Sequence, residues 1–115
     1  MKDVLVNLNR EVGVKGSMIL TRDGVVVAAE IRPPLNSDTV AAIASDSIRR
    51  INATLRDLGS NEFIRYLFNS NFGRMVFTEA GEPYLVVVLD KNINIDFTML
   101  SVASAARKIR NLGQG

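Results

Sequence analysis

The sequence contains no cysteine and no histidine. The absence of cysteine excludes disulfides, thiolate zinc sites and thiol nucleophiles together, and it fits a reducing compartment such as the cytoplasm. The absence of histidine removes the commonest general base and a common metal ligand. We therefore expect a protein that is not an enzyme and that uses no metal or cofactor. At most, it would assist catalysis by another protein.

Long apolar runs and charge of one sign are also scarce. No apolar run approaches the length of a membrane span, and the first residues lack the pattern of a signal peptide. Lys and Arg number 14 against 12 Asp and Glu, so a formal charge of +2 is spread over the chain. These features predict a cytoplasmic protein that binds neither membranes nor nucleic acid.

What remains is the composition of an ordinary globular protein. Hydrophobic residues make up 47% and charged residues 23% of the 115 residues, far from the polar composition of disordered chains. A chain of this length has enough residues for one hydrophobic core and too few for two ordinary domains. We predict a single domain over residues 1–115.

Three segments have the periodicity of helices. Residues 2–12 form a short amphipathic segment that ends at Gly13. Residues 39–58 contain neither Gly nor Pro and follow several candidate N-cap residues, which predicts a long helix. Residues 97–112 return to helical spacing, with Gly113 as the predicted cap.

Five segments have the pattern of β-strands. They are residues 17–22, 25–31, 62–69, 74–78 and 84–89. Asp23-Gly24 between the first two is typical of a type I′ hairpin turn, which needs positive φ at both central residues. A second turn is predicted at residues 71–73, because Asn and Gly there favour chain reversal. The last strand is apolar on both faces, as expected for a central strand that is covered on both sides.

The predicted order is α-β-β-α-β-β-β-α, which indicates an α+β sandwich. A five-stranded antiparallel sheet is the simplest way to bury these patterns together. The fifth strand would pair with the first at the centre, which leaves the second and third strands as edges. The long middle helix would cover one face, and the two terminal helices would share the other.

The third strand is the informative edge, because it exposes apolar residues. Such an edge tends to be covered, most simply by its own copy across a two-fold axis. On the long helix, one broad apolar stripe predicts contact with the sheet: Val40, Ile43, Ala44, Ser47, Ile51, Leu55 and Leu58. A second, narrower band of the helix would join the strand in a homodimer. The predicted interface is Ala41, Ser45, Ile48, Asn52, Phe63, Ile64, Arg65, Tyr66 and Leu67.

The polar back of the long helix carries several arginines. Arginine can stabilise the charge that develops during phosphoryl transfer, but exposed helices ordinarily carry such residues for solubility. We take Arg49 and Arg56 as candidates for contact with a partner protein.

Several stretches resemble a known family. The string VGVKGS at residues 12–17, the strand and turn LTRDGV at residues 20–25, the Ala-rich helices and the meander of three strands are similar to Roadblock/dynein light chain domains. The likeness covers nearly the whole chain and is strongest to bacterial gliding and polarity proteins of the MglB type. It implies a homodimer with a sheet continuous through the third strand and with paired long helices. It also implies a scaffold or regulator of a small Ras-like GTPase, with the nucleotide bound by that partner.

Two other hypotheses stay open. A ligand-sensing domain of the profilin or PAS type would hold a small molecule between sheet and helices, although the sequence offers few buried polar groups to orient one. The chain could also be a purely structural dimerisation subunit of a larger complex.

Overall fold

A computed structural model of the chain describes residues 1–71 and 73–114. Its helices and strands follow the predicted order. The elements are α1 (Lys2–Leu8), β1 (Val14–Leu20), β2 (Val26–Ile31), α2 (Ser37–Asp57), β3 (Arg65–Asn69), β4 (Arg74–Glu79), β5 (Tyr84–Leu89) and α3 (Ile95–Gln114). Within the described residues, no helix is both long enough and apolar enough to cross a bilayer.

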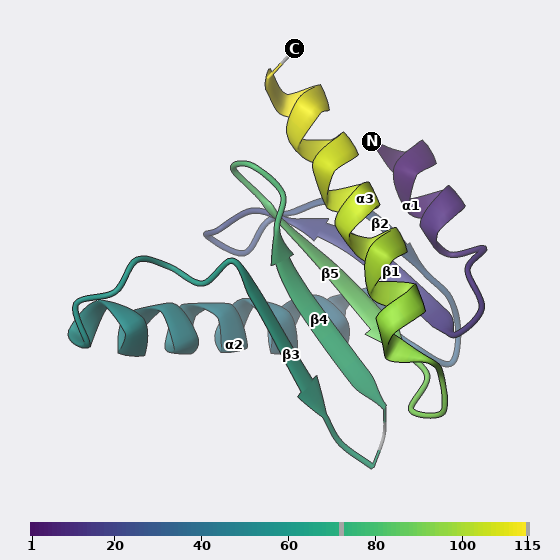
Figure 1. The fold of residues 1–115 in the computed structure, drawn as a ribbon, viewed down its shortest axis with the longest axis horizontal. Coiled ribbons are helices and arrows are strands. Elements are labelled where there is room, and N and C mark those ends of the chain that lie inside the picture. The colour runs from purple at the N-terminus through teal and green to yellow at the C-terminus, as the bar shows by residue number, and fades with distance from the viewer. Residues whose placement is uncertain (72, 115) are drawn as a thin grey trace.

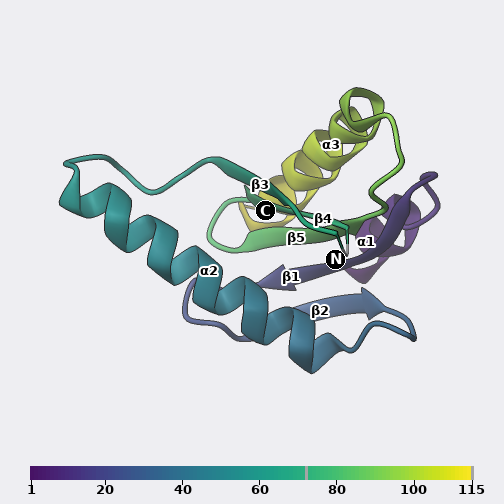
Figure 2. The same ribbon diagram turned by 90° about the horizontal axis from the view of Figure 1, so that it is seen from below.

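The five strands form one sheet in the order β2-β1-β5-β4-β3, and all neighbouring strands are antiparallel. This confirms the prediction that β5 and β1 pair at the centre and that β2 and β3 are the edges. Helix α2 lies on one face of the sheet, and α1 and α3 lie on the other (Figures 1 and 2).

Strand β5 serves both layers of the core. Its residues alternate: Leu85 and Leu89 pack with α1 and α3, whereas Tyr84, Val86 and Val88 pack with α2. All six residues of the strand are buried. The unbroken apolar sequence of β5 is therefore explained by a helix on each side of it.

Helix α2 begins where the sequence supplies a cap. The side chain of Asn36 accepts a hydrogen bond from the backbone N–H of Thr39 at 3.1 Å. This bond satisfies one of the N–H groups that have no partner inside the first turn. The helix consequently starts at Ser37, two residues before the predicted start.

The hairpin between β1 and β2 differs from the prediction. Only Gly24 has positive φ at this turn, at 95°, whereas a type I′ turn would also need positive φ at Asp23. The backbone N–H of Thr21 donates to the carbonyl of Val25 at 2.8 Å, which makes the loop one residue longer. The hydroxyl of Thr21 stabilises this wider turn, because it donates to Asp23 and accepts from the N–H of Val25.

Helix α1 ends at Leu8, four residues before the predicted Val12. The cause is Asn9, whose side chain turns toward the sheet. Its Nδ2 donates to the carbonyl of Glu30 at 2.8 Å, and its Oδ1 accepts from the hydroxyl of Ser17 at 2.7 Å. These bonds lead the chain into β1 instead of another helical turn, and Val12 stays 87% exposed.

The structure also bears on the predicted turn at residues 71–73 and on the end of α3. The turn at residues 71–73 includes Phe72, which lies outside the described residues; on either side of it, Ser70 and Gly73 exchange backbone hydrogen bonds of 2.8 and 3.2 Å. Helix α3 continues through Gly113, so the predicted cap there is wrong. Gly113 is not among the glycines with positive φ, the conformation that such a cap requires.

Candidate protein-interaction site

Strand β3 presents an open edge with apolar side chains along it. On its inner side it pairs with β4, and no strand of the described sheet lies on its outer side. Ile64 is 71% exposed, and Leu67 and Tyr66 are 40% and 37% exposed. Unpaired backbone groups beside exposed apolar side chains are the usual mark of an edge that pairs with another chain.

Aromatic contacts hold this edge against the rest of the sheet. The ring of Tyr66 stacks on that of Phe77 in β4, with centroids 6.2 Å apart, and Phe68 packs against the same ring at 5.9 Å. Tyr66 and Phe68 therefore lie on the α2 side of the sheet. Leu67, opposite Val76, lies on the α3 side. Both faces of β3 thus carry apolar side chains up to the open edge.

The helix residues that were predicted to meet a second copy are already in use within the chain. Ile48 and Asn52 are buried, at 3% and 4% exposed. Ala41 packs against the cluster beneath α2, and Ser45 lies against the β1–β2 turn, within 4 Å of the position that a Cβ on Gly24 would occupy. This band faces the sheet, and the predicted assignment of helix faces has to be corrected.

The uncovered flank of α2 lies about a quarter turn around the helix from Ile48. It includes part of the stripe that was predicted to contact the sheet. Ile43 is 46% and Leu58 77% exposed, and Ser47 and Ile51 are half-buried between them. Periodicity could not decide between the two stripes, because they are adjacent and the buried one contains the polar Asn52.

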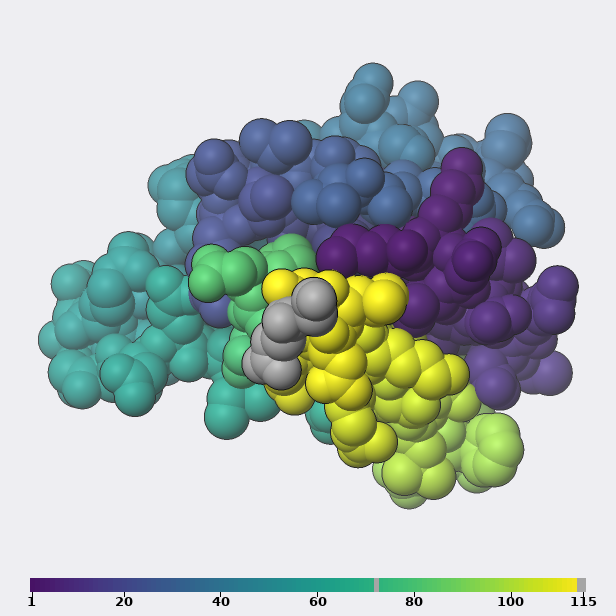
Figure 3. Space-filling view, turned by 90° about the horizontal axis from the view of Figure 1, so that it is seen from above, coloured from purple at the N-terminus to yellow at the C-terminus, as the bar shows by residue number. Residues whose placement is uncertain are grey.

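The C-terminal part of α2 extends beyond the sheet. In Figure 1 the helix passes behind β3 and continues beyond it to the left, and the chain then turns back to enter β3. Figure 3 shows the end of α2 and the connection that follows it as a teal lobe that protrudes at the left. We call the end of α2 and its cap, residues 51–58, the overhang; its first turn includes the buried Asn52, which still contacts the sheet, and the turns after Asn52 project beyond it. The overhang carries Leu58 and the half-buried Ile51 and Leu55.

A large groove opens on the same face, between the N-terminal half of α2 and the far end of β3. Its volume is about 800 Å³. Its floor and walls are mostly apolar, with two cations at the rim. The lining residues are Lys15, Arg32, Pro33, Pro34, Leu35, Asn36, Thr39, Val40, Ile43, Phe68, Ser70, Met75 and Val88. Sequence reasoning missed this groove, because it joins segments that lie far apart in the chain.

Arg49 and Arg56 stand on the outer surface, away from the groove. Two turns of helix separate them, so they share one flank about 10 Å apart along the axis. Arg49 and Arg50 both form ion pairs with Asp46. A hydrogen bond from Arg50 is the main cause that lowers the pKa of Asp46. Asp46 thus fixes one of the two predicted partner-binding arginines.

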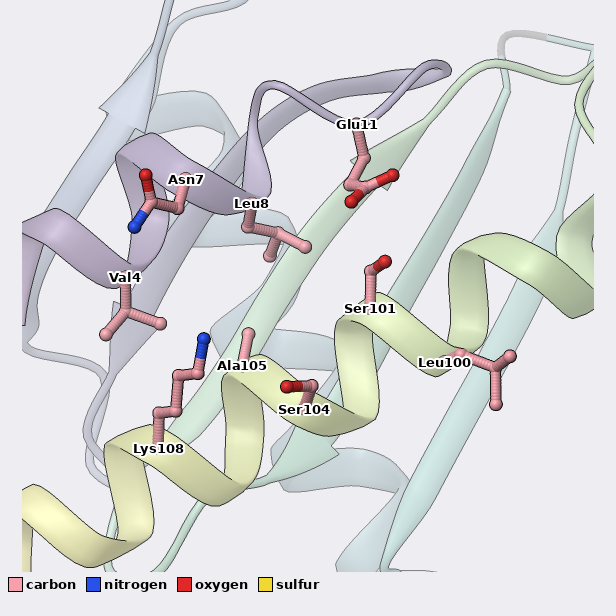
Figure 4. Close-up of a pocket in the computed structure, with 9 residues that line it drawn as sticks. All are labelled: Val4, Asn7, Leu8, Glu11, Leu100, Ser101, Ser104, Ala105 and Lys108. Atoms are coloured by element: carbon pink, nitrogen blue, oxygen red, sulfur yellow. The ribbon is translucent and has the colours of Figure 1, made fainter.

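A second, smaller groove of about 260 Å³ separates α1 from α3. Figure 4 shows Val4 and Leu8 of α1 above Ala105 of α3, with Glu11 at one end of the groove and Lys108 at the other. No group of three or more potential metal ligands occurs anywhere in residues 1–71 and 73–114.

Comparison with known proteins agrees with this architecture. The sequence profile of the Roadblock/LC7 domain matches residues 1–90. A protein of uncharacterized function from Methanocaldococcus jannaschii is 32% identical over 107 residues, which cover 93% of this chain and 91% of the relative. The chain belongs to the Roadblock/LC7 domain family.

Solved structures of MglB have the same fold. The gliding protein MglB of Thermus thermophilus superposes with a TM-score of 0.83 at 22% identity, covering 97% of this chain and 87% of MglB. Myxococcus xanthus MglB gives 0.89 at 15% identity, with 98% and 94% covered. At these identities the likeness shows a common fold.

Proposed function

We propose that this chain is a homodimeric, non-enzymatic scaffold that binds and regulates a small Ras-like GTPase in the cytoplasm. The observation that carries the proposal is the combination, on one face of one chain, of an open apolar edge, an uncovered overhang and a groove of matching character. The Roadblock/LC7 membership supports a regulatory or scaffold module. The GTPase partner is suggested by the resemblance to proteins of the MglB type.

Two-fold symmetry relates the overhang to the groove. If two copies of β3 pair antiparallel about an axis near Leu67, the start of one strand lies beside the end of the other. The overhang stands at the start of β3, and the groove opens beside Phe68 near its end. Each copy would therefore place its overhang over the groove of its partner, so that the interface is self-complementary.

The chemistry of the two parts also matches. The overhang offers the aliphatic side chains of Ile51, Leu55 and Leu58, and the groove offers Phe68 and Met75 among its apolar lining. Burying an exposed leucine of this kind contributes roughly 1.5–3 kcal/mol. Because symmetry repeats each contact, the same side chain stabilises the dimer twice.

The paired α2 helices would form the platform for the GTPase. Each helix would bring Arg49 and Arg56 to the flank opposite the groove, where a globular partner could reach both copies. Both arginines are exposed, but Arg49 already forms an ion pair with Asp46. Arg56 is therefore the stronger candidate for a new contact with an acidic side chain of the partner.

Solution mass measured by light scattering after size-exclusion chromatography tests both parts of the proposal. The chain alone should have twice the mass of one copy. Mixed with a small GTPase from the same genome, it should co-elute with the form loaded with a GTP analogue and not with the GDP form. A monomer that ignores both forms would contradict the proposal.

The groove also favours a second candidate function, the binding of a small molecule. A mostly apolar volume of about 800 Å³ with Lys15 and Arg32 at its rim has the size and character of a ligand pocket. The two functions exclude each other at this place, because the overhang of a second copy would fill the groove. A monomer whose thermal stability rises with aliphatic carboxylates would support the ligand pocket.

A further inference from the structure

Three side chains meet at the phenol oxygen of Tyr84, close to the point where the chain enters β3. Asn52 Nδ2 and Arg22 Nη1 each donate to Tyr84 Oη at 3.0 Å. The phenol in turn donates to Glu62 Oε2 at 3.2 Å. Arg22 also forms an ion pair with Glu62, and its guanidinium lies 4.8 Å from the centre of the Tyr84 ring. We call Arg22, Asn52, Glu62 and Tyr84 the Tyr84 cluster.

The cluster uses the full hydrogen-bonding capacity of the phenol, which has one donor and two acceptor sites. Tyr84 is fully buried and Asn52 nearly so, whereas Arg22 and Glu62 lie at the surface. Burial raises the pKa of Tyr84 above its ordinary value. The phenol therefore stays protonated at neutral pH and remains a donor to Glu62.

The cluster joins elements that are distant in sequence. Arg22 comes from the β1–β2 turn, Asn52 from α2, Tyr84 from β5 and Glu62 from the connection between α2 and β3. That connection was predicted to be strand from residue 62 onward. The strand begins only at Arg65, and just before it the backbone N–H of Phe63 is bonded to the side chain of Asn52 instead of to a neighbouring strand.

The next residue of the connection is held by the same cluster. Asn52 Oδ1 accepts the backbone N–H of Phe63 at 2.9 Å, and the ring of Phe63 lies 5.0 Å from that of Tyr84. One residue later, the carbonyl of Ile64 accepts from the N–H of Glu79 in β4 at 2.8 Å. The cluster therefore fixes the chain immediately before the first bond that joins this edge to the sheet.

We propose that Arg22, Asn52, Glu62 and Tyr84 are positioning residues that hold the start of β3 in line for pairing with a second copy of this chain. A short edge strand on a loose connection would have to be ordered when it pairs, and that loss of entropy weakens association. The cluster orders the connection in advance. This role rests on the proposed homodimer.

A second ion pair in the chain provides a matched control. Arg110 Nη2 lies 3.7 Å from Glu79 Oε1, and Arg110 also donates to the Glu79 carbonyl. The arginine side chains of the two pairs are nearly equally exposed, at 38% for Arg22 and 37% for Arg110. The Arg110 pair ties α3 to β4. Glu79 also bonds the Ile64 carbonyl through its backbone N–H, and Arg110→Met leaves that backbone group in place.

The experiment compares Tyr84→Phe, Arg22→Met and Glu62→Gln with the control Arg110→Met. Hydrogen exchange at the Phe63 amide is measured by NMR in a Leu67→Asp background, which is designed to be monomeric. The dissociation constant of the dimer is measured by sedimentation without that background. We expect the Phe63 amide to lose protection in the three cluster variants and their dissociation constants to rise about tenfold. Arg110→Met should change neither quantity.

Two results would overturn the positioning role. Unchanged protection at Phe63 would show that the cluster does not hold the connection. Lost protection with an unchanged dissociation constant would show that the order of the connection does not affect pairing. If Tyr84→Phe fails to fold, the two surface variants decide. A wild-type chain that stays monomeric would end the homodimer proposal, whereas Phe63 exchange would still report whether the cluster orders the connection.

Discussion

The two edge strands of the sheet are protected in different ways. At β2, Asn9 binds the carbonyl of Glu30, and Lys2 forms an ion pair with the same residue at 3.3 Å. Helix α1 thus covers part of that edge, although Val25 and Val27 near the turn stay exposed. At β3, α2 passes behind the strand and extends beyond the sheet (Figure 1), and the edge keeps its exposed apolar side chains. The comparison teaches that one edge is partly closed by residues of the same chain, whereas the other stays open.

The largest expected effect is the loss of the dimer when charge enters the β3 edge. Leu67→Asp would bring two carboxylates together near the two-fold axis, where burial and repulsion both oppose pairing. We expect the dissociation constant to rise roughly hundredfold or more, measured by sedimentation.

The matched control for this change is Val27→Asp on the β2 edge, where the side chain is 49% exposed. It should leave the mass of the dimer unchanged. If Val27→Asp dissociates the protein and Leu67→Asp does not, the seam lies at β2 and the comparison is reversed.

Removing the most exposed leucine of the overhang should have the next largest effect. Leu58→Ala deletes a side chain that is 77% exposed in the single chain and that would be buried in the partner's groove. We expect the dissociation constant to rise about tenfold to hundredfold, since symmetry counts the loss twice. Leu100→Ala, at 70% exposed on α3, is the control and should leave association unchanged. Equal effects of the two substitutions would argue against the overhang.

Opening the closed edge should give a smaller effect, on folding instead of association. Asn9→Ala removes the bond to the Glu30 carbonyl and leaves the hydroxyl of Ser17 without its acceptor at Asn9. We expect the free energy of unfolding in urea to fall by about 1–3 kcal/mol. Asn7→Ala, on the exposed side of α1, should change the free energy of unfolding little. A stability of Asn9→Ala equal to that of the wild type would mean that Asn9 does not close this edge.

The smallest effect concerns pH, because Tyr84, in the cluster near β3, can lose a proton, whereas Asn9 at β2 cannot. The raised pKa of Tyr84 means that the folded state holds the phenolic proton more tightly than the unfolded state. The resulting stabilisation is complete below the unfolded pKa of about 10 and is lost as the pH rises through the folded pKa. Between roughly pH 9 and 12, the wild type should lose more free energy of unfolding than Tyr84→Phe. Parallel curves would contradict this.

The sequence was a good guide wherever the apolar pattern of an element has a single interpretation. The apolar residues on both faces of β5 predicted that this strand lies at the centre of the sheet. The position of β3 at an edge followed from the order of elements. The flank of α2 that faces the sheet could not be predicted in this way. Asn52 looks like a surface residue until Tyr84, 32 positions later, supplies its hydrogen bond. The start of β3 was misplaced for the same reason, because the backbone N–H of Phe63 binds the side chain of Asn52 from another element.

The overhang and the groove have a consequence for how such a protein can diversify. They are separate parts of one chain, and a symmetric pair would use each of them twice. After a gene duplication, one copy could lose Leu58 and the other could fill the groove beside Phe68. Only one overhang and one groove would then remain, on different chains, and they would meet only in the mixed pair. A few substitutions would thus convert a self-pairing protein into two that require each other.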